Sequence, residues 1–230
     1  MPEGSVQMEF VAFPKIPRYS RDCIVTEKID GTNGQIYITP IGESGTAQAI
    51  LFGSRSRWIT PSNDNHGFAK WGTEHAEELF KLGPGLHFGE WWGQGINRGY
   101  NKKEKCFSLF NVTRWDADMF ERFKIGAWER NGHKLPKPEF KALPKCCSTV
   151  PIIAVGTFGW DVVSLAISAL EASGSYAAPG FMRPEGVVVY HTAGNHLYKR
   201  TIEHDAEPKG RQSKDYMEQR KRSEDAILRG

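Results

Sequence analysis

The sequence has no apolar run long enough to span a membrane, and it has no Cys-x-x-Cys pair. Its longest apolar stretches, at 150–155 and 187–190, are far shorter than the roughly 20 residues of a transmembrane helix. The adjacent cysteines Cys146 and Cys147 cannot by themselves supply a tetrahedral zinc site. Residues 1–10 lack the basic and apolar regions of a signal peptide. We therefore expect a cytoplasmic protein with reduced cysteines and no membrane partner.

The sequence also has little excess of either charge. Its 30 Lys and Arg residues and 27 Asp and Glu residues give a net charge of +3, which neither requires nor excludes a polyanionic partner. With 230 residues, of which 39% are hydrophobic and 25% charged, the composition is that of an ordinary globular protein. This excludes disordered, collagen-like and coiled-coil classes.

Strand and helix patterns are mixed along the chain rather than strictly alternating. We expect strands over 23–27, 35–39, 49–52, 86–92, 105–112, 150–155, 185–190 and 196–202, and helices over 68–82, 117–129 and 161–172. The bend at 30–34 (DGTNG) predicts a hairpin between the first two strands. We expect an α+β domain over 1–202, with antiparallel sheets flanked by helices, and a charged tail over 203–230 that is helical or partly disordered.

A lysine, Lys28, stands at the end of the first expected strand, in the segment 27–34 (EKIDGTNG). The glycines that follow let the backbone come close to a ligand, and Lys28 can reach a phosphate as a cation or as a nucleophile. The same letters also fit a surface lysine beside a turn. The segment alone is therefore not decisive.

Charged residues follow in an order that a nucleotide and a divalent metal would need. Arg55 lies in a basic turn, Glu90 lies in an apolar strand, Glu185 opens another apolar strand, and Lys199 follows a turn. Carboxylates bind ribose hydroxyls and Mg²⁺, and cations bind phosphate oxygens. Structural ion pairing among these same residues is the alternative.

These motifs, in this order, resemble those of the covalent nucleotidyltransferase superfamily, and the best match is to RNA ligases of the second bacteriophage class. The similar segments are EKIDGTN, SRSR, FGEW, FSLFN, EGVV and LYKR. The resemblance implies a nucleotidyltransferase (ligase adenylation) fold. It also implies an ATP-dependent RNA ligase that joins a 5′-phosphate to a 3′-hydroxyl through a lysyl-AMP and an adenylated 5′ end. ATP, Mg²⁺ or Mn²⁺, and RNA ends are the implied cofactors and partner, and we expect a monomer.

The resemblance also assigns roles to single residues. Lys28 is implied to attack ATP and to carry AMP. Glu90 is implied to hold the ribose, and Glu185 to organise the metal and the phosphates. Arg55 is implied to contact phosphate or ribose, and Lys199 to neutralise the charge that grows on the α-phosphate.

Three more residues match positions in the family. Phe110 matches an aromatic that stacks on adenine, although it also fits a core strand. Asn33 matches a residue that helps to position the metal, and it also fits a turn cap. Glu27 matches a residue whose backbone contacts the base edge, and it also fits a solvated strand end.

The chain departs from the family pattern near its end. Related ligases present two lysines one residue apart, whereas here Lys199 is followed by Arg200 and Thr201. Successive strand residues point to opposite faces, so Arg200 cannot simply replace the missing cation. Either the reaction with ATP is slow, or another residue such as Arg57 or Lys209 supplies the charge. Residues 203–230 are too few for a further domain, so we expect a minimal catalytic domain.

Other functions stay open at this point. A DNA-nick ligase or a GTP-using guanylyltransferase shares the K-x-D-G pattern, although both normally carry an additional OB domain. A catalytically impaired nucleotide- or RNA-binding module would account for the incomplete last motif, but it would have no chemical use for Lys28. We expect RNA contacts from the loop 94–100 and from the lysines of 102–105 and 137–145, which also fit ordinary solvated faces.

Overall fold

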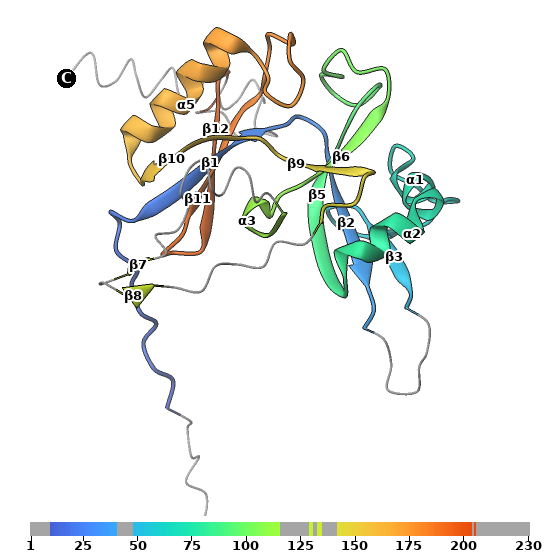
Figure 1. The fold of residues 1–230 in the computed structure, drawn as a ribbon, viewed down its shortest axis with the longest axis horizontal. Coiled ribbons are helices and arrows are strands. Elements are labelled where there is room, and N and C mark those ends of the chain that lie inside the picture. Colours follow the sequence, from blue (N-terminus) through green and yellow to red (C-terminus); the bar gives the residue numbers. More distant parts are fainter. Residues whose placement is uncertain are drawn as a thin grey trace, which may run out of the picture.

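The computed structural model describes residues 10–40, 48–115, 129–130, 133–134, 142–203 and 205. The fold is built around two β-sheets that lie side by side (Figure 1). The smaller sheet has the strand order β10-β1-β11-β12, and the larger has the order β4-β3-β2-β5-β6-β9. All neighbouring strands are antiparallel except β6 and β9, which are parallel. This confirms the expected α+β class with antiparallel sheets.

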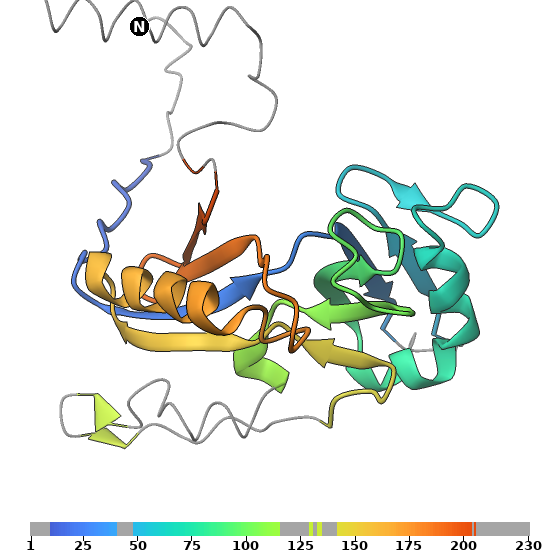
Figure 2. The ribbon, with the colours of Figure 1, turned by 90° about the horizontal axis from the view of Figure 1, so that it is seen from above.

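The smaller sheet is covered on one face by a single long helix. Its strands are β1 (Asp22–Lys28), β10 (Ile152–Thr157), β11 (Gly186–His191) and β12 (His196–Thr201). Helix α5 (Trp160–Ser173) lies across them (Figure 2). Its buried residues Ala166, Ile167 and Leu170 pack against apolar residues of β1 and β11. The expected helix over 161–172 and the expected strands over 185–190 and 196–202 are thus confirmed, and the two strands pair as a hairpin.

The larger sheet is covered on one face by short helices. Its strands are β2 (Thr32–Ile38), β3 (Ile50–Gly53), β4 (Trp58–Ile59), β5 (Gly85–Gly93), β6 (Lys105–Leu109) and β9 (Cys147–Thr149). The helices are α1 (Phe68–Glu74), α2 (Ala76–Leu79) and the 3-10 turn η1 (Phe80–Leu82). The sequence predicts one helix here, but it is interrupted at His75, where φ is −110°.

The predicted hairpin at 30–34 is wrong. Strand β1 pairs with β10 and β11, whereas β2 pairs with β3 and β5. The residues between β1 and β2 therefore carry the chain from one sheet to the other. Ile29, in this crossing, is only 3% exposed and packs with Ile24 of the smaller sheet and Trp92 of the larger one. A shared apolar cluster thus joins the two sheets next to Lys28.

The remaining elements are short. Strand β6 ends before the expected residue 112, and helix α3 (Val112–Trp115) follows it. Glu129, expected as the last residue of a helix, begins β7 (Glu129–Arg130), which pairs with β8 (His133–Lys134). The rest of that helix and nearly all of the 203–230 tail lie outside the described residues. Within the described part of the chain, no helix is long and apolar enough to cross a membrane.

Candidate active site

Lys28 and Glu185 are brought together by the pairing of two neighbouring strands. Lys28 is the last residue of β1, Glu185 immediately precedes β11, and the register places Lys28 opposite Gly186. The Lys28 Nζ lies 2.5 Å from the Glu185 Oε2, and the Glu185 side chain is only 3% exposed. A carboxylate that is this buried needs a charged partner, because an unpaired buried charge costs several kcal/mol. The structure thus joins two residues that lie 157 positions apart.

The strand register places Lys199 on the same face of the smaller sheet as Lys28. Residues opposite one another in antiparallel strands share a face. Lys199 pairs with Val188, and Val188 pairs with Thr26, two positions before Lys28. Arg200 points to the other face, where its guanidinium lies over a tryptophan ring. The inference that Arg200 cannot supply a second cation beside Lys28 is therefore supported by the geometry.

Thr201 stands in the same row across the sheet as Lys28, with Gly186 between them. A Cβ atom on Gly186 would lie 2.2 Å from the Arg200 carbonyl oxygen, so the site admits only glycine. Strand β11 consequently places no side chain between Lys28 and Thr201. Thr201, where the resemblance implies a second lysine, thus lies in the row of Lys28 with no side chain of β11 between them.

Glu90 approaches the crossing segment from the larger sheet. It lies in β5, is 9% exposed, and its Oε1 accepts a hydrogen bond from the Gly31 N–H at 3.0 Å. Burial raises the pKa of the Glu90 carboxyl to about 7, and the Lys28 charge opposes that rise. Asn33 lies directly opposite Glu90 in the β2–β5 register, so the two side chains share a face. Lys28, Glu90 and Asn33 are therefore grouped around the crossing.

Glu27 is engaged with the protein on the other face of β1. Its backbone N–H donates to the Pro151 carbonyl at 2.8 Å, and its Oε2 accepts from the N–H groups of Tyr176 and Ala177 at 2.8 and 2.9 Å. Burial raises the pKa of this carboxyl, and the Ser175 hydroxyl and the two N–H groups oppose that effect. Glu27 thus anchors the segment after α5, a role that its sequence did not indicate. Its contact with a base edge stays a prediction.

Arg55 and Phe110 lie at the surface of the larger sheet. Arg55 is exposed in the turn between β3 and β4, and no contact joins it to Lys28 in the described residues. Phe110 follows β6, is 40% exposed, and donates its backbone N–H to the Phe88 carbonyl at 3.0 Å. Phe88 lies two positions before Glu90 in β5 and is 51% exposed. Alternation along the strand puts Phe88 on the face of Glu90, so an aromatic surface is available there for stacking.

Sequence reasoning missed the side chains that hold the segment after Lys28. Three residues of loop 94–100, from which we expect RNA contacts, bind the protein. The Tyr100 hydroxyl accepts from the Asp30 N–H at 2.8 Å. The Asn97 Nδ2 donates to the Asp30 Oδ1 at 3.1 Å and to the Gly31 carbonyl at 2.6 Å. Both loop residues have positive φ angles, 44° for Asn97 and 52° for Tyr100, which non-glycine residues rarely adopt.

Arg98 completes this set, and we call Asn97, Arg98 and Tyr100 the loop brace. The Arg98 Nε lies 3.2 Å from the Asp30 Oδ2. The same guanidinium donates to the Arg183 carbonyl at 3.0 Å and lies 3.4 Å from the Glu203 Oε2. One side chain therefore links the segments that adjoin Lys28, the start of β11 and the end of β12. The signal in the sequence is an arginine and a tyrosine in the glycine-rich loop directly after the strand of Glu90.

A family model described as RNA ligase matches residues 21–202 of this chain. The chain belongs to the RNA ligase family. This confirms the resemblance that the six ordered motifs indicate. Among curated proteins, no sequence matches the chain.

Solved structures of RNA ligase from Naegleria gruberi also match this chain. One variant, solved with ATP and Mn, is 17% identical, with a TM-score of 0.44, and the match covers 80% of this chain and 50% of that one. Another variant with the same ligands is 15% identical, with a TM-score of 0.49 and coverages of 80% and 51%. The chain thus spans about half the length of these ligases.

The donor atoms near Lys28 suit a metal ion that is bound largely through the substrate. Within the described residues, no group of three or more His, Cys, Asp or Glu side chains is placed to hold a metal ion. Mg²⁺ commonly keeps several waters and binds one or two carboxylates together with substrate phosphates. Glu185, beside Lys28, is a carboxylate of this kind, and Asn33 offers an amide oxygen.

Proposed function

We propose that this protein is an ATP-dependent RNA ligase that works through a covalent lysyl-AMP on Lys28. The observation that carries the proposal is the contact between the Lys28 Nζ and the buried Glu185 Oε2 at 2.5 Å. Membership of the RNA ligase family supports it, because the matched residues 21–202 include both side chains. A pure binding module would have no chemical use for an amine held at this place.

In the first step, the Lys28 Nζ attacks the α-phosphorus of ATP. A nitrogen–phosphorus bond forms, the bond to the bridging oxygen of the β-phosphate breaks, and pyrophosphate leaves. The ammonium must lose a proton before its lone pair can react, and the Glu185 Oε2 is placed to take it. Lys199, on the same face, would neutralise the charge that grows on the α-phosphate.

The remaining residues would hold the nucleotide. Glu90 would accept hydrogen bonds from the ribose hydroxyls, Phe110 would stack on the adenine, and Arg55 would contact phosphate or ribose. Mg²⁺ or Mn²⁺, held by Glu185 and Asn33, would supply positive charge beside the phosphates. These roles rest on the motif resemblance, and the grouping of Lys28, Glu90 and Asn33 around the crossing supports them.

In the later steps, AMP passes from Lys28 to the 5′-phosphate of an RNA strand. The phosphorus–nitrogen bond breaks, and a pyrophosphate linkage to the strand forms. A neighbouring 3′-hydroxyl then attacks that 5′-phosphate, forms the phosphodiester and releases AMP. We propose that the protein does this as a monomer in the cytoplasm.

The test is the intact mass of the protein after incubation with ATP and Mg²⁺, with GTP in parallel. We expect a gain equal to one adenylyl group with ATP alone. The Lys28→Arg variant should gain nothing, because arginine keeps a cation beside Glu185 but offers no comparable nucleophile. An unchanged gain in Lys28→Arg would refute the assignment of the nucleophile. A gain with GTP alone would instead favour a guanylyltransferase.

An end-joining assay then separates RNA ligation from the alternatives. A pre-adenylated RNA strand and an RNA with a 3′-hydroxyl should be joined without ATP, and the matching DNA strands should be joined more slowly. Preferential sealing of a DNA nick would indicate a DNA ligase. Failure with every strand, together with no adenylyl gain, would leave the binding module as the better description.

A further inference from the structure

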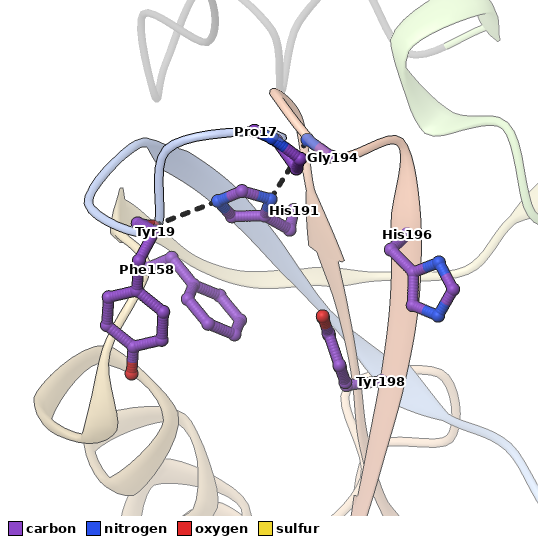
Figure 3. A pocket seen from close by; sticks show the side chains of 7 residues that line it. All are labelled: Pro17, Tyr19, Phe158, His191, Gly194, His196 and Tyr198. Atoms are coloured by element: carbon purple, nitrogen blue, oxygen red, sulfur yellow. Dashed lines mark hydrogen bonds between the residues drawn. The ribbon is translucent and has the colours of Figure 1, made fainter. Parts of the chain in front are cut away.

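A hollow lies at the end of the smaller sheet away from Lys28. It measures about 280 Å³ and is lined by Pro17, Tyr19, Phe158, His191, Gly194, His196 and Tyr198 (Figure 3). We call it the aromatic hollow. His191 and His196 are opposite one another at the turn between β11 and β12. Lys28 ends β1 at the other end of these strands, where it pairs with Gly186. The length of β1 puts about 20 Å between the hollow and the nucleophile.

The hollow lies on the face of the sheet that is opposite Lys28. Lys199 shares the face of Lys28, so the alternating residues His196 and Tyr198 of β12 point the other way. Phe158, just before α5, contacts this side: its ring centre lies 5.4 Å from that of Tyr198 and 4.8 Å from that of His191. The site is therefore separate from the residues that would hold ATP.

The rings of the hollow combine exposed and fixed surfaces. Tyr19 is 67% exposed and Tyr198 is 48% exposed, so both present ring surface to solvent. The Tyr19 ring meets Phe158 edge-on at 5.1 Å, and the His196 ring lies 5.3 Å from Tyr198. Flat rings that are exposed and close together suit a flat aromatic ligand, and stacking on such rings does not depend on the identity of a base.

The buried histidine fixes one wall of the hollow. The Gly194 N–H donates to the His191 Nδ1 at 3.0 Å, so this nitrogen carries no proton. The other nitrogen, Nε2, lies 3.0 Å from the Tyr19 carbonyl and therefore donates its hydrogen to it (Figure 3). The neutral ring thus ties the chain before β1 to the β11–β12 turn. Little conformational freedom of this wall would be lost on binding.

The segment that lines one side of the hollow is rich in exposed cations, which favours an anionic chain. The segment 10–22, which contributes Pro17 and Tyr19, carries Lys15, Arg18 and Arg21 but only one acid, Asp22. All of these charged residues are exposed. Farther along the same face of β12, the Arg200 guanidinium lies 4.1 Å from the centre of the Trp160 ring. Its buried Nε has no hydrogen-bond partner within the described residues. Aromatic rings flanked by cations are what single-stranded nucleic acid binds.

We propose that the aromatic hollow binds one unpaired base of the RNA strand, with the cations of segment 10–22 on the neighbouring phosphates. The inference rests on the proposed ligase function, and it names the surface that grips the strand away from the reacting ends. A free nucleotide carries the same kind of base, but the three cations of segment 10–22 favour a strand with several phosphates. The basic loop 94–100 does not offer this grip, because its loop brace is engaged with the protein.

The test compares variants of β12 in binding a 5′-phosphorylated single-stranded RNA oligonucleotide, measured by fluorescence anisotropy. Tyr198→Ala should weaken binding about tenfold, because it removes one stacking ring. Tyr198→Phe keeps the ring and should bind like the wild type. Leu197→Ala is the matched control, since Leu197 is 64% exposed on the same strand but points to the other face. Unlabelled AMP should not compete when it is present at the concentration of ATP that saturates the first step.

Photo-crosslinking locates the bound base directly. An oligonucleotide with one 4-thiouridine should crosslink to Tyr19, Phe158 or Tyr198. Wild-type affinity in Tyr198→Ala, equal losses in Leu197→Ala and Tyr198→Ala, or crosslinks confined to the face of Lys28 would each overturn the proposal. Competition by AMP would assign the hollow to a free nucleotide and overturn the strand model.

Formation of the lysyl adenylate separates this proposal from the proposed function. Tyr198→Ala should gain its adenylyl group at the wild-type rate, because the hollow is distant from Lys28. If the wild type forms the adenylate and binds RNA but Tyr198→Ala binds equally well, only the proposal that the aromatic hollow binds a base is refuted. If the wild type forms no adenylate and joins no pre-adenylated RNA strand, the ligase function is refuted, whatever the binding result.

Discussion

Glu90→Gln should remove a pH dependence from the stability of this fold. Burial raises the pKa of the Glu90 carboxyl from 4.5 to about 7. Between these values the folded protein binds a proton more tightly than the unfolded chain does. The free energy of unfolding of the wild type must therefore fall as pH rises through this window, and it levels off above the folded pKa. Glutamine cannot ionise, but its side-chain oxygen can still accept the Gly31 hydrogen bond.

The magnitude follows from the same two values. At 1.36 kcal/mol for each pH unit, the rise from 4.5 to about 7 corresponds to about 3 kcal/mol. Burial also raises the pKa of Glu27, so the wild-type curve alone would mix two groups. Both proteins contain Glu27, and its contribution cancels when the variant is subtracted from the wild type.

The assay is urea denaturation of both proteins at several pH values from 4.5 to 8. The stability of the wild type relative to Glu90→Gln should be greatest at the acid end and should fall by about 3 kcal/mol towards pH 8. In a Lys28→Met background the fall should occur at higher pH, because the ammonium no longer favours the ionised carboxylate. A difference that stays constant with pH would refute the assignment of a buried, protonated Glu90.

Two further substitutions test the crossing and its support. Gly31→Ala should cost about 1–3 kcal/mol and slow adenylation, because its Cβ would lie 2.5 Å from the Trp91 carbonyl oxygen. Gly159→Ala is the control in the same denaturation assay, because its Cβ would lie 4.0 Å from the nearest atom, the Thr157 carbonyl oxygen. Equal losses of stability in the two variants would contradict the argument. Arg98→Ala should cost at most about 1 kcal/mol, because the ion pair is partly exposed, yet slow single-turnover adenylation about tenfold. An unchanged rate would show that the Asp30 segment keeps its position without Arg98.

The fold class and most elements were predictable because local patterns determine them. The apolar run of β11, the turn that follows it and the helix formers of α5 predicted elements that the structure confirms. The hairpin at 30–34 failed because a glycine-rich bend turns the chain in the same way in a hairpin and in a crossing between sheets. Strand β1 pairs with β10 and β11, and β2 pairs with β3 and β5. No local sequence pattern indicates these pairing partners. The apolar Ile29 beside the bend argued against a hairpin at the surface, because a residue beside a surface turn is seldom buried.

The site was predictable in its charges but not in its supports. Lys28, Glu90 and Glu185 stand out in the sequence because a charged residue in an apolar strand requires a partner. Which charges meet is a matter of register, and the contact between Lys28 and Glu185 follows from the pairing of β1 with β11. The loop brace was missed because a glycine-rich loop with a cation has the same sequence pattern whether it binds RNA or the protein itself.

The geometry gives the departure in the last strand a definite consequence. Strand β12 is described in full, and its alternation puts Lys199 and Thr201 on the face of Lys28 and sends Arg200 to the face of α5. Lys199 is therefore the one cation that β12 presents to the nucleophile. In the proposed first step, the charge that grows on the α-phosphate would meet one lysine from this strand instead of two. A hydrogen-bonding hydroxyl offers less stabilisation to an anion than an ammonium does, so the deficit should fall on the reaction with ATP. Transfer from a pre-adenylated RNA strand bypasses that reaction and should be affected less.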